Sequence, residues 1–319
     1  MKKIGLLTSG GDAPGMNAAI RSIVQTGFYF GIDVIGIERG YTGLLQQRFQ
    51  FLDNDKIGNI IDKGGTVLKS SRCEEMKTEA GIYQAISILQ KNGIDGLIVI
   101  GGDGSFQGAA KISAGNIKVV CLPGTIDNDL AYTEYSIGFD TAVNTVLESI
   151  SRIRDTSISH EKATIIEVMG RNCGDIALYA GLAGGAEMIV LPEHGYCKEE
   201  VCAEVIRRRK AGDTHITLLL AEGCGSADLL RQDIMDTTGI DVRVTVLGFL
   251  QRGGSPTAFD RILASRMGHY AVDLLAHRKG NCAIGIKNNS LFNIDITSAI
   301  NQKKEANDTL YTLTKILSR

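Results

Sequence analysis

Two short polar turns contain the residues whose types and spacing best suit chemistry. GGDGS at residues 101–105 places Asp103 among glycines, and PGTIDND at residues 123–129 carries Thr125, Asp127 and Asp129. Glycines let a backbone approach phosphate closely, and an aspartate between them can hold a hard cation such as Mg²⁺, which prefers oxygen ligands. The second turn offers a hydroxyl beside two carboxylates, one of which can accept a proton from an attacking alcohol.

Both turns follow apolar runs of strand length, GLIVI from residue 96 and IKVVCLP from residue 117. Ligands of an open parallel sheet bind at the carboxyl ends of its strands, so we expect the two turns to be neighbours. In an extended backbone, the alternate positions Thr125, Asp127 and Asp129 would share one side. The structural alternatives are that Asp103 is a helix N-cap and that PGTIDND is a plain capping loop.

The N-terminal segment and a later loop supply further candidates for phosphate binding. KKIGLLT predicts a strand that leads into a helix, with Pro14 in the first helical turn and Gly10 and Gly11 at its positive end. Those glycines suit either a phosphate cradle or a simple tight turn. DKGGTVLKSSR is not a Walker A motif, because Leu68 stands where glycine is required. Arg72 at its end is either a phosphate ligand or a surface arginine.

The second half of the chain again alternates strand and helix signals. The apolar runs of KATIIEVMGRNCG, ITLLLAEG and VRVTVLGFLQRGGSP end near Arg171, Glu222 and Arg252, and Arg243 lies near the start of the last run. Arginines suit the phosphate of a sugar phosphate and a glutamate suits its hydroxyl groups. RRRK at residues 207–210 is predicted to be a solvated face at a helix C-terminus.

Composition narrows the class of protein. The 319 residues, 44% of them hydrophobic, are enough for two lobes with their own cores. A net charge of -2 argues against nucleic-acid or membrane partners, and the apolar runs are too short to span a bilayer, so we expect a cytoplasmic protein. The seven cysteines form no CxxC pair and the five histidines are scattered, so we expect reduced thiols and no zinc site.

Five motifs in register carry a resemblance to a known family. TSGGDAPGMN, GGDGS, PGTIDND, EVMGR and QRGGSP occur in this order, and together they strongly resemble the bacterial ATP-dependent 6-phosphofructokinases from about residue 2 to about residue 300. The resemblance implies an α/β fold with two doubly wound, Rossmann-like lobes and the active site between them. The expected lobes are residues 1–138 with 251–301, which would bind ATP, and residues 139–250 with 302–319, which would bind fructose 6-phosphate.

The resemblance also implies an activity and an assembly. Members of the family transfer the γ-phosphoryl group of ATP, with Mg²⁺, to the 1-hydroxyl of fructose 6-phosphate, giving fructose 1,6-bisphosphate and ADP in glycolysis. They assemble as homotetramers in which subunits share sites. This chain is therefore expected to be a phosphotransferase with an alcohol acceptor.

Individual residues match the positions of the family that act on each substrate. The positions for ATP are Gly11, Arg72, Cys73, Gly102, Asp103, Gly104 and Ser105, with Asp103 also the Mg²⁺ position. The catalytic positions are Asp127 as the base, Thr125 and Arg171 beside the transferring phosphoryl group, and Asp129 beside the base. The sugar-phosphate positions are Thr125, Asp127, Lys162, Met169, Gly170, Arg171, Glu222, Arg243, Phe249 and Arg252. Of these, Lys162 and Arg243 match residues that come from a neighbouring subunit.

The phosphoryl donor is indicated by two glycines. Relatives that use pyrophosphate usually carry aspartate in place of Gly104 and lysine in place of Gly124, so the glycines favour ATP. The alternatives are a pyrophosphate-dependent phosphofructokinase, another kinase with a GGDG loop, and a non-catalytic sugar-phosphate sensor on the same fold. The intact Asp103 and Asp127 argue against the sensor.

The regulatory cleft of the family is only partly matched. Arg21, Arg154, Gly185 and Glu187 match its positions, but neutral or acidic residues stand where cations are common, namely Gln25, Asn54, Ala211, Asp213 and Thr214. Loss of that positive charge weakens the binding of anionic ligands. We therefore expect activation by ADP and inhibition by phosphoenolpyruvate to be weak or absent.

The substitutions at Lys162 and Phe249 predict weak binding of the sugar phosphate. Most members carry arginine and histidine there, and phenylalanine cannot donate to phosphate. A hydrogen bond to a charged group contributes about 1.5 to 3 kcal/mol. The Phe249→His variant should therefore show a lower KM for fructose 6-phosphate than the natural chain in steady-state assays. An unchanged KM would contradict this prediction.

Overall fold

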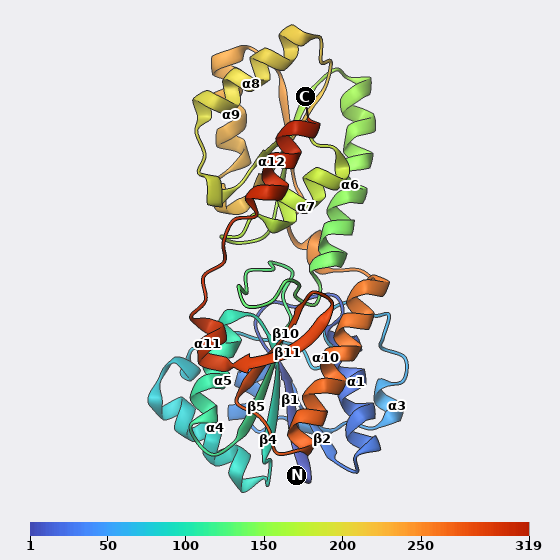
Figure 1. Cartoon of the computed structure of the whole chain (residues 1–319), viewed down its shortest axis with the longest axis vertical. Coiled ribbons are helices and arrows are strands. Elements are labelled where there is room, and N and C mark those ends of the chain that lie inside the picture. The colour runs from blue at the N-terminus through green and yellow to red at the C-terminus, as the bar shows by residue number, and fades with distance from the viewer. Residues whose placement is uncertain (319) are drawn as a thin grey trace. The chain divides into compact units, whose positions relative to one another are not determined.

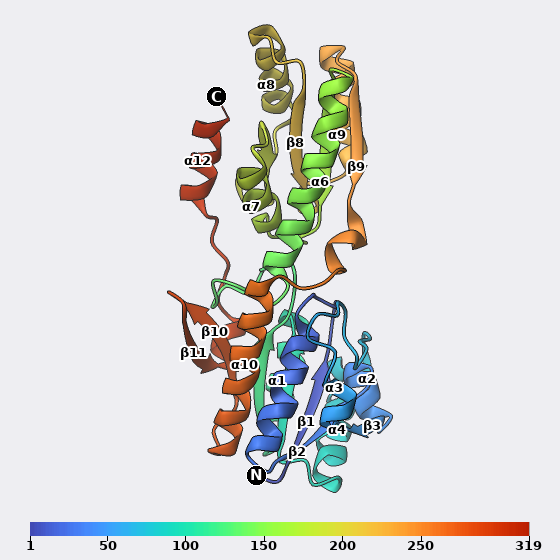
Figure 2. The same ribbon diagram turned by 90° about the vertical axis from the view of Figure 1, so that its right-hand side faces the viewer.

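The chain divides into two compact units, each with its own sheet (Figures 1 and 2). The structure, a computed structural model, describes residues 1–318; Arg319 and the side chain of Asn54 lie outside the described part. Unit 1 contains residues 1–126, 130–141 and 252–303. Unit 2 contains residues 127–129, 142–251 and the segment from Lys304 onward. The PGTIDND turn is therefore divided between the two units, and what each unit binds stays a prediction.

The sheet of unit 1 has the strand order β11-β10-β5-β4-β1-β2-β3. Its parallel strands are β1 (Lys3–Thr8), β2 (Asp33–Ile37), β4 (Gly96–Gly101), β5 (Lys118–Pro123) and β10 (Cys282–Lys287). The antiparallel edges are β3 (Phe49–Phe51) and β11 (Ser290–Asp295), which the apolar patterns did not reveal. The central strand β4 is buried along its whole length, as expected for a parallel strand covered on both faces.

Helices cover both faces of this sheet. On one face α1 (Met16–Tyr29) packs against α10 (Ala258–Ala276), closely enough that a Cβ on Gly268 would lie 2.9 Å from the Ala19 carbonyl oxygen. The other face carries α2 (Gly40–Leu45), α4 (Glu79–Lys91), α5 (Asp103–Ser113) and α11 (Ile296–Ile300) (Figure 1). Two short helices, α3 (Asn54–Ile57) and η1 (Glu75–Lys77), complete unit 1.

Unit 2 is built on four parallel strands in the order β7-β8-β6-β9. These are β6 (Ala163–Val168), β7 (Met188–Val190), β8 (Ile216–Ala221) and β9 (Val242–Val246). One face packs against α8 (Lys198–Ala211) and α9 (Ala227–Thr238), where the aliphatic core of the unit lies. The other face packs against α7 (Asp175–Gly184), which also contacts α6 (Phe139–Ser159) and α12 (Asp308–Leu317). Three short helices follow strands, η2 (Pro192–His194), η3 (Glu222–Cys224) and η4 (Gly248–Arg252).

The α/β fold with two Rossmann-like sheets is confirmed, but two local expectations are wrong. Helix α1 begins at Met16 rather than around Pro14, because Gly15 before it adopts a left-handed conformation with φ of 103°. The PGTIDND turn is not extended, since the chain bends at Ile126 and Asp127 and Asn128 has φ of 51°. Strand alternation therefore does not set the directions of the Thr125, Asp127 and Asp129 side chains.

One buried carboxylate in unit 1 joins the starts of two long helices. Asp260, in the first turn of α10, is fully buried and accepts hydrogen bonds from the backbone N–H groups of Gly138 at 2.9 Å and Thr141 at 2.8 Å, and from the Thr141 hydroxyl at 2.5 Å. Thr257 caps α10 by accepting from Asp260 N–H and donates its hydroxyl proton to Asp140 at 2.6 Å. Asp260 thus satisfies N–H groups at the start of α6 that lack partners within that helix.

Burial raises the pKa of Asp260 to about 6 despite these hydrogen bonds. The Asp260 carboxyl group therefore binds its proton more tightly in the folded state than in the unfolded state. Protonation of Asp260 stabilises the fold at low pH, and this stabilisation is lost as pH rises from about 4 to about 6. The Asp260→Asn variant lacks this titration. The difference in unfolding free energy, natural chain minus variant, should fall by up to about 3 kcal/mol between pH 4 and pH 7. Urea unfolding followed by circular dichroism checks this, and parallel pH profiles for the two chains would contradict it.

Candidate functional site

The glycine-rich loops of unit 1 lie at the point where its strand order reverses. The chain leaves β1 toward β2 on one side and later returns to β4 on the other side, the arrangement that leaves a ligand crevice at the carboxyl ends of such strands. The Gly10–Gly11 loop follows β1 and the GGDGS loop follows β4. The Ser9 N–H group ties them together by donating to the Ile100 carbonyl at 3.0 Å.

Gly11 is in direct contact with one of the predicted sugar-phosphate residues. A Cβ at Gly11 would overlap the guanidinium of Arg252, which donates to the Asp12 carbonyl at 3.2 Å. A side chain at this position would displace the guanidinium from where it now lies. The structure thus brings together Gly11 and Arg252 within unit 1, although the family resemblance assigns Gly11 to ATP and Arg252 to the sugar phosphate.

The GGDGS loop forms the first turn of α5. Gly102 is the N-cap residue and Asp103 is the first helical residue, so the alternative that Asp103 itself is the N-cap is wrong. Asp103 is half-buried and accepts from the Gln107 side chain at 2.7 Å. The buried Tyr41 hydroxyl holds the Ser105 carbonyl at 2.6 Å. The N–H groups and positive dipole of this helix start can bind a phosphate group.

The second polar turn lies directly beside this helix start. A Cβ on Gly102 would lie 3.7 Å from the Cβ of Thr125, so the two turns are neighbours as expected. Thr125 and Asp127 are 8% and 3% exposed. The Ser136 hydroxyl holds the Thr125 carbonyl at 2.7 Å. The Thr125 residue and the start of α5 therefore adjoin each other within unit 1, and Asp127 follows Thr125 two residues later in the chain.

The loop that bears Arg72 and Cys73 is anchored to unit 1 at several points. The fully buried Asn17 side chain donates to the carbonyl groups of residues 63 and 64 and accepts from residue 67. The Thr8 hydroxyl, at the end of β1, donates to the Lys69 carbonyl at 2.9 Å, and the Thr42 hydroxyl donates to the Arg72 carbonyl at 3.1 Å. Partial burial raises the pKa of the Cys73 thiol. The loop is thus held at the carboxyl edge of the sheet.

In unit 2, four of the predicted sugar-phosphate residues lie at the carboxyl ends of β6 and β8. The Met169 N–H group donates to Gln251 at 3.1 Å, and the Arg171 N–H group donates to the Glu222 carboxylate at 2.7 Å. Gly170 and Arg171 have φ of 134° and 56°, so the chain turns sharply here. The Arg171 guanidinium lies 3.7 Å from the Asp129 carboxylate.

Lys162 and Arg243 lie at the opposite ends of the strands. Both pair with Asp241 just before β9, and the Lys162 hydrogen bond lowers the pKa of that carboxyl. Strand β6 has 6 residues, so about 20 Å separates these cations from Arg171. In one copy of the chain, a single ligand therefore cannot contact all four candidates of unit 2, namely Lys162, Arg171, Glu222 and Arg243. Phe249, in η4, is 82% exposed.

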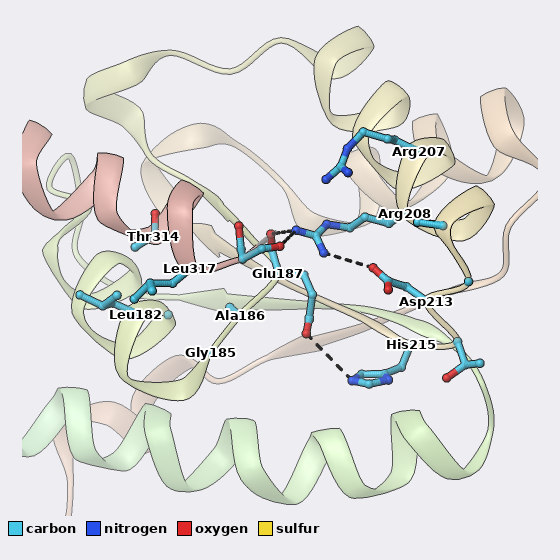
Figure 3. A pocket seen from close by; sticks show the side chains of 15 residues that line it. Leu182, Gly185, Ala186, Glu187, Arg207, Arg208, Asp213, His215, Thr314 and Leu317 are labelled. Atoms are coloured by element: carbon cyan, nitrogen blue, oxygen red, sulfur yellow. Dashed lines mark hydrogen bonds and ion pairs between the residues drawn. The ribbon is translucent and has the colours of Figure 1, made fainter.

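Two of the three matched regulatory residues of unit 2 line a cavity of about 460 Å³ (Figure 3). Gly185 and Glu187 line it, and the Arg154 guanidinium donates to the Gly185 carbonyl at 2.9 Å. Glu187 accepts from the Thr217 N–H group at 2.6 Å. The fourth candidate, Arg21, is in α1 of unit 1.

The expectation that RRRK is a solvated face is wrong for Arg208. This side chain is 6% exposed and pairs with Glu204 at 3.0 Å and Asp213 at 3.2 Å. It also donates to the carbonyl groups of Glu187 and Ser318 (Figure 3). The arginine turns inward because two carboxylates and two carbonyl groups compensate its charge.

Three residues that support the site were missed by sequence reasoning. Gln251 is fully buried and holds Met169, while Asn128 and Asp175 are buried and hydrogen-bonded to each other at 2.8 Å. Asn128 and Gln251 are polar residues within two of the motifs, and Asp175 directly follows the run KATIIEVMGRNCG. A polar residue in such a position does not by itself distinguish a buried partner from a solvated one.

A metal would have to be held with few protein ligands. The described residues contain no group of three or more histidine, cysteine, aspartate or glutamate side chains placed to hold a metal ion. Mg²⁺ is usually bound by one or two carboxylates together with substrate phosphates and water. Asp103, half-buried beside the open backbone at Gly104, fits that donor set. No helix among the described residues is long and apolar enough to cross a membrane.

The two glycines that indicated the donor differ in their surroundings, which predicts different effects of substitution. A Cβ at Gly104 meets nothing within 4 Å, whereas one at Gly124 would lie 2.7 Å from Ile100 and 3.1 Å from Met16. Gly104→Ala should leave the free energy of unfolding within about 1 kcal/mol, and Gly124→Ala should lower it by about 1 to 3 kcal/mol through overpacking. Urea unfolding of both variants checks this, and equal losses would contradict it.

Comparison with known proteins identifies the family. The phosphofructokinase family matches residues 3–275. Over the whole length of both chains, the protein is 55% identical to the ATP-dependent 6-phosphofructokinases of Alkaliphilus metalliredigens and Clostridioides difficile and 52% identical to that of Clostridium novyi.

Solved structures agree in fold. A phosphofructokinase from Saccharomyces cerevisiae matches with a TM-score of 0.89 and 32% identity over the whole of this chain, which spans 48% of that longer chain. A pyrophosphate-dependent phosphofructokinase from Marinobacter aquaeolei matches with a TM-score of 0.86 and 23% identity over 96% of this chain and 86% of that one, which shows the common fold. The five motifs, the two α/β units and these matches together show that the chain belongs to the phosphofructokinase family.

Proposed function

We propose that this protein is an ATP-dependent 6-phosphofructokinase that transfers the γ-phosphoryl group of ATP to the 1-hydroxyl of fructose 6-phosphate. The observation that carries the proposal is the contact between Gly102, at the start of α5, and Thr125, in the turn that also bears Asp127. Relatives that are more than half identical over their full length carry this enzyme name. The products are fructose 1,6-bisphosphate and ADP.

The nucleotide part of the proposed site lies in unit 1. The backbone around Gly11 and from Gly102 to Ser105 donates to the phosphates of ATP, and Arg72 adds positive charge from the anchored loop. Asp103 holds Mg²⁺, which when bound neutralises charge on the phosphate oxygens. Gly104 leaves the space beside this carboxylate open. Gly124 has a structural explanation in its contact with Ile100, so Gly104 carries the argument for ATP as donor.

The proposed chemistry is an in-line transfer with Asp127 as the base. The 1-hydroxyl oxygen attacks the γ-phosphorus, its proton passes to the Asp127 carboxylate, and the bond from the γ-phosphorus to the bridging oxygen of ADP breaks. Thr125 and Arg171 stabilise charge on the transferring group. Glu222 fixes the Arg171 backbone through a 2.7 Å hydrogen bond, which directs this arginine. The protein mainly positions reactants, which phosphoryl transfer requires.

The sugar-phosphate site is proposed to be completed by a second copy. Met169, Gly170, Arg171 and Glu222 lie at one end of the unit 2 sheet, whereas Lys162 and Arg243 lie about 20 Å away at the other. Those two cations therefore serve a neighbouring subunit in a homotetramer. Arg252 adds a cation from the segment that contacts Gly11. The exposed side chain of Phe249 supplies no donor to phosphate.

Regulation by nucleotide or phosphoenolpyruvate is proposed to be weak. In the cavity that Gly185 and Glu187 line, Asp213 adds negative charge and compensates Arg208. An anionic effector would have to compete with that carboxylate. The cytoplasmic location stays a prediction.

The activity is tested in a coupled assay with ATP, Mg²⁺ and fructose 6-phosphate. Asp127→Asn keeps the shape of the side chain but cannot accept the hydroxyl proton, so kcat should fall by about 10² to 10⁴-fold, while the KM for ATP should stay within about threefold. Replacing ATP by pyrophosphate should abolish turnover by the natural chain. Turnover supported by pyrophosphate alone, or undiminished turnover by the variant, would overturn the proposed reaction.

A further inference from the structure

The turn that bears Asp127 and Asp129 is held by the loop that follows β6. Asn128, between the two carboxylates, is 1% exposed and donates its side-chain amide to the Asp175 carboxylate at 2.8 Å. The Cys173 thiol approaches the Asn128 carbonyl at 3.9 Å, and Arg171 lies 3.7 Å from Asp129. Alternate residues of the loop, at positions 171, 173 and 175, therefore contact the turn.

Asp175 is a buried charge with two partners that belong to distant parts of the sequence. It is the first residue of α7 and is 7% exposed. Its Oδ2 atom, which accepts from Asn128, also lies 3.1 Å from the Lys304 ammonium, in the segment between α11 and α12. A carboxylate that is buried to this degree requires such compensation. A plain first-turn aspartate would only need to face solvent near the helix dipole.

The loop that carries Asp175 is itself fixed by two other carboxylates. Glu222 accepts from the Arg171 N–H group at 2.7 Å, and Glu193 accepts from the Gly174 N–H group at 2.7 Å. A Cβ on Gly223 would lie 2.4 Å from the Arg171 carbonyl oxygen if it were present, so this part of the backbone is closely packed. Asp175 is thus presented to Asn128 from a firmly held segment.

We propose that Asp175, with its charge compensated by Lys304, is a positioning residue that directs the carboxylates of Asp127 and Asp129. Asn128 has φ of 51°, a left-handed conformation that asparagine tolerates but does not prefer. The hydrogen bond from its side chain holds that conformation, which sets the directions of the residues on either side. This inference rests on the proposed role of Asp127 as the base. A displacement of about 1 Å at a reacting group can lower the rate by about a hundredfold.

Steady-state kinetics of the full-length protein test this role. Asp175→Ala removes the acceptor and should lower kcat by about 10 to 100-fold, while the KM for ATP, whose proposed ligands are in unit 1, stays within about twofold. Asp175→Asn retains an oxygen that can accept from Asn128, so it should recover kcat to within about threefold of the natural chain. Lys304→Met keeps that hydrogen bond and should lower kcat less than Asp175→Ala does.

A double-mutant cycle separates positioning from a general effect on folding. Asn128→Ala removes the donor and should lower kcat as much as Asp175→Ala, and the two changes together should add little. Glu204→Ala is the matched control, because it breaks an ion pair with the buried Arg208 in the same unit. It should lower the unfolding temperature and leave kcat unchanged. If Asp175→Ala fails to fold, the Asn128→Ala variant provides the same measurement.

The possible outcomes distinguish this inference from the proposed function. An active natural chain with unchanged kcat in Asp175→Ala or Asn128→Ala overturns the positioning role alone. Equal losses of kcat in Asp175→Ala and Asp175→Asn overturn it as well. Such a result would mean that kcat depends on the charge of Asp175 and not on its hydrogen bond with Asn128. Fully additive losses in the double variant also contradict it. An inactive natural chain overturns the proposed function.

Discussion

The parallel pairing of β4 with β5 is the constraint on which the rest of the site depends. The ladder places Gly101 opposite Pro123 and continues one step further, because the Gly124 N–H group donates to the Gly101 carbonyl at 3.0 Å. Since the two strands end at the same level, the helix start that can bind phosphate and the turn that bears Thr125 begin side by side. No loop flexibility can separate them without breaking backbone hydrogen bonds in the buried centre of the sheet. Gly102 and Gly124 keep this junction free of side chains. A side chain at Gly124 would collide with Ile100, which already fills the neighbouring space.

Buried carboxylates orient the segments around this junction, and they do so in two different ways. Asp260 is compensated mainly by backbone N–H groups at the start of α6, and desolvation still raises its pKa to about 6. Asp175 is compensated by a side-chain amide and by the ammonium of Lys304. The first arrangement fixes the direction in which a helix begins. The second links the turn between Asp127 and Asp129 to a loop that would contact the sugar, so one polar group connects the base to the acceptor side of the proposed reaction.

The predicted cationic residues of unit 2 lie at opposite ends of its sheet. This separation favours the proposal that two copies of the chain contribute to one sugar-phosphate site. Arg171 follows β6, while Lys162 precedes it and shares Asp241 with Arg243. The length of a strand prevents these cations from meeting one phosphate within a single copy. Paired with Asp241, Lys162 and Arg243 keep their charge at the surface of the unit, where a second copy can use it. Under the proposed function, Lys162 and Arg243 would complete the sugar-phosphate site of a second copy.

The sequence by itself determined the family, the α/β class and the polar turns, because five motifs and strand-length apolar runs are local patterns that can be read without knowing what packs against them. Tertiary structure decided the rest. The left-handed conformation of Asn128 and the burial of Arg208 depend on partners far along the chain, Asp175 in one case and Glu187 and Ser318 in the other. The edge strands β3 and β11 carry too weak a pattern to be recognised and form by pairing with strands that are already buried. Chemistry-bearing residue types are therefore visible in the sequence, whereas their directions and the groups that compensate their charge arise only when distant segments pack together.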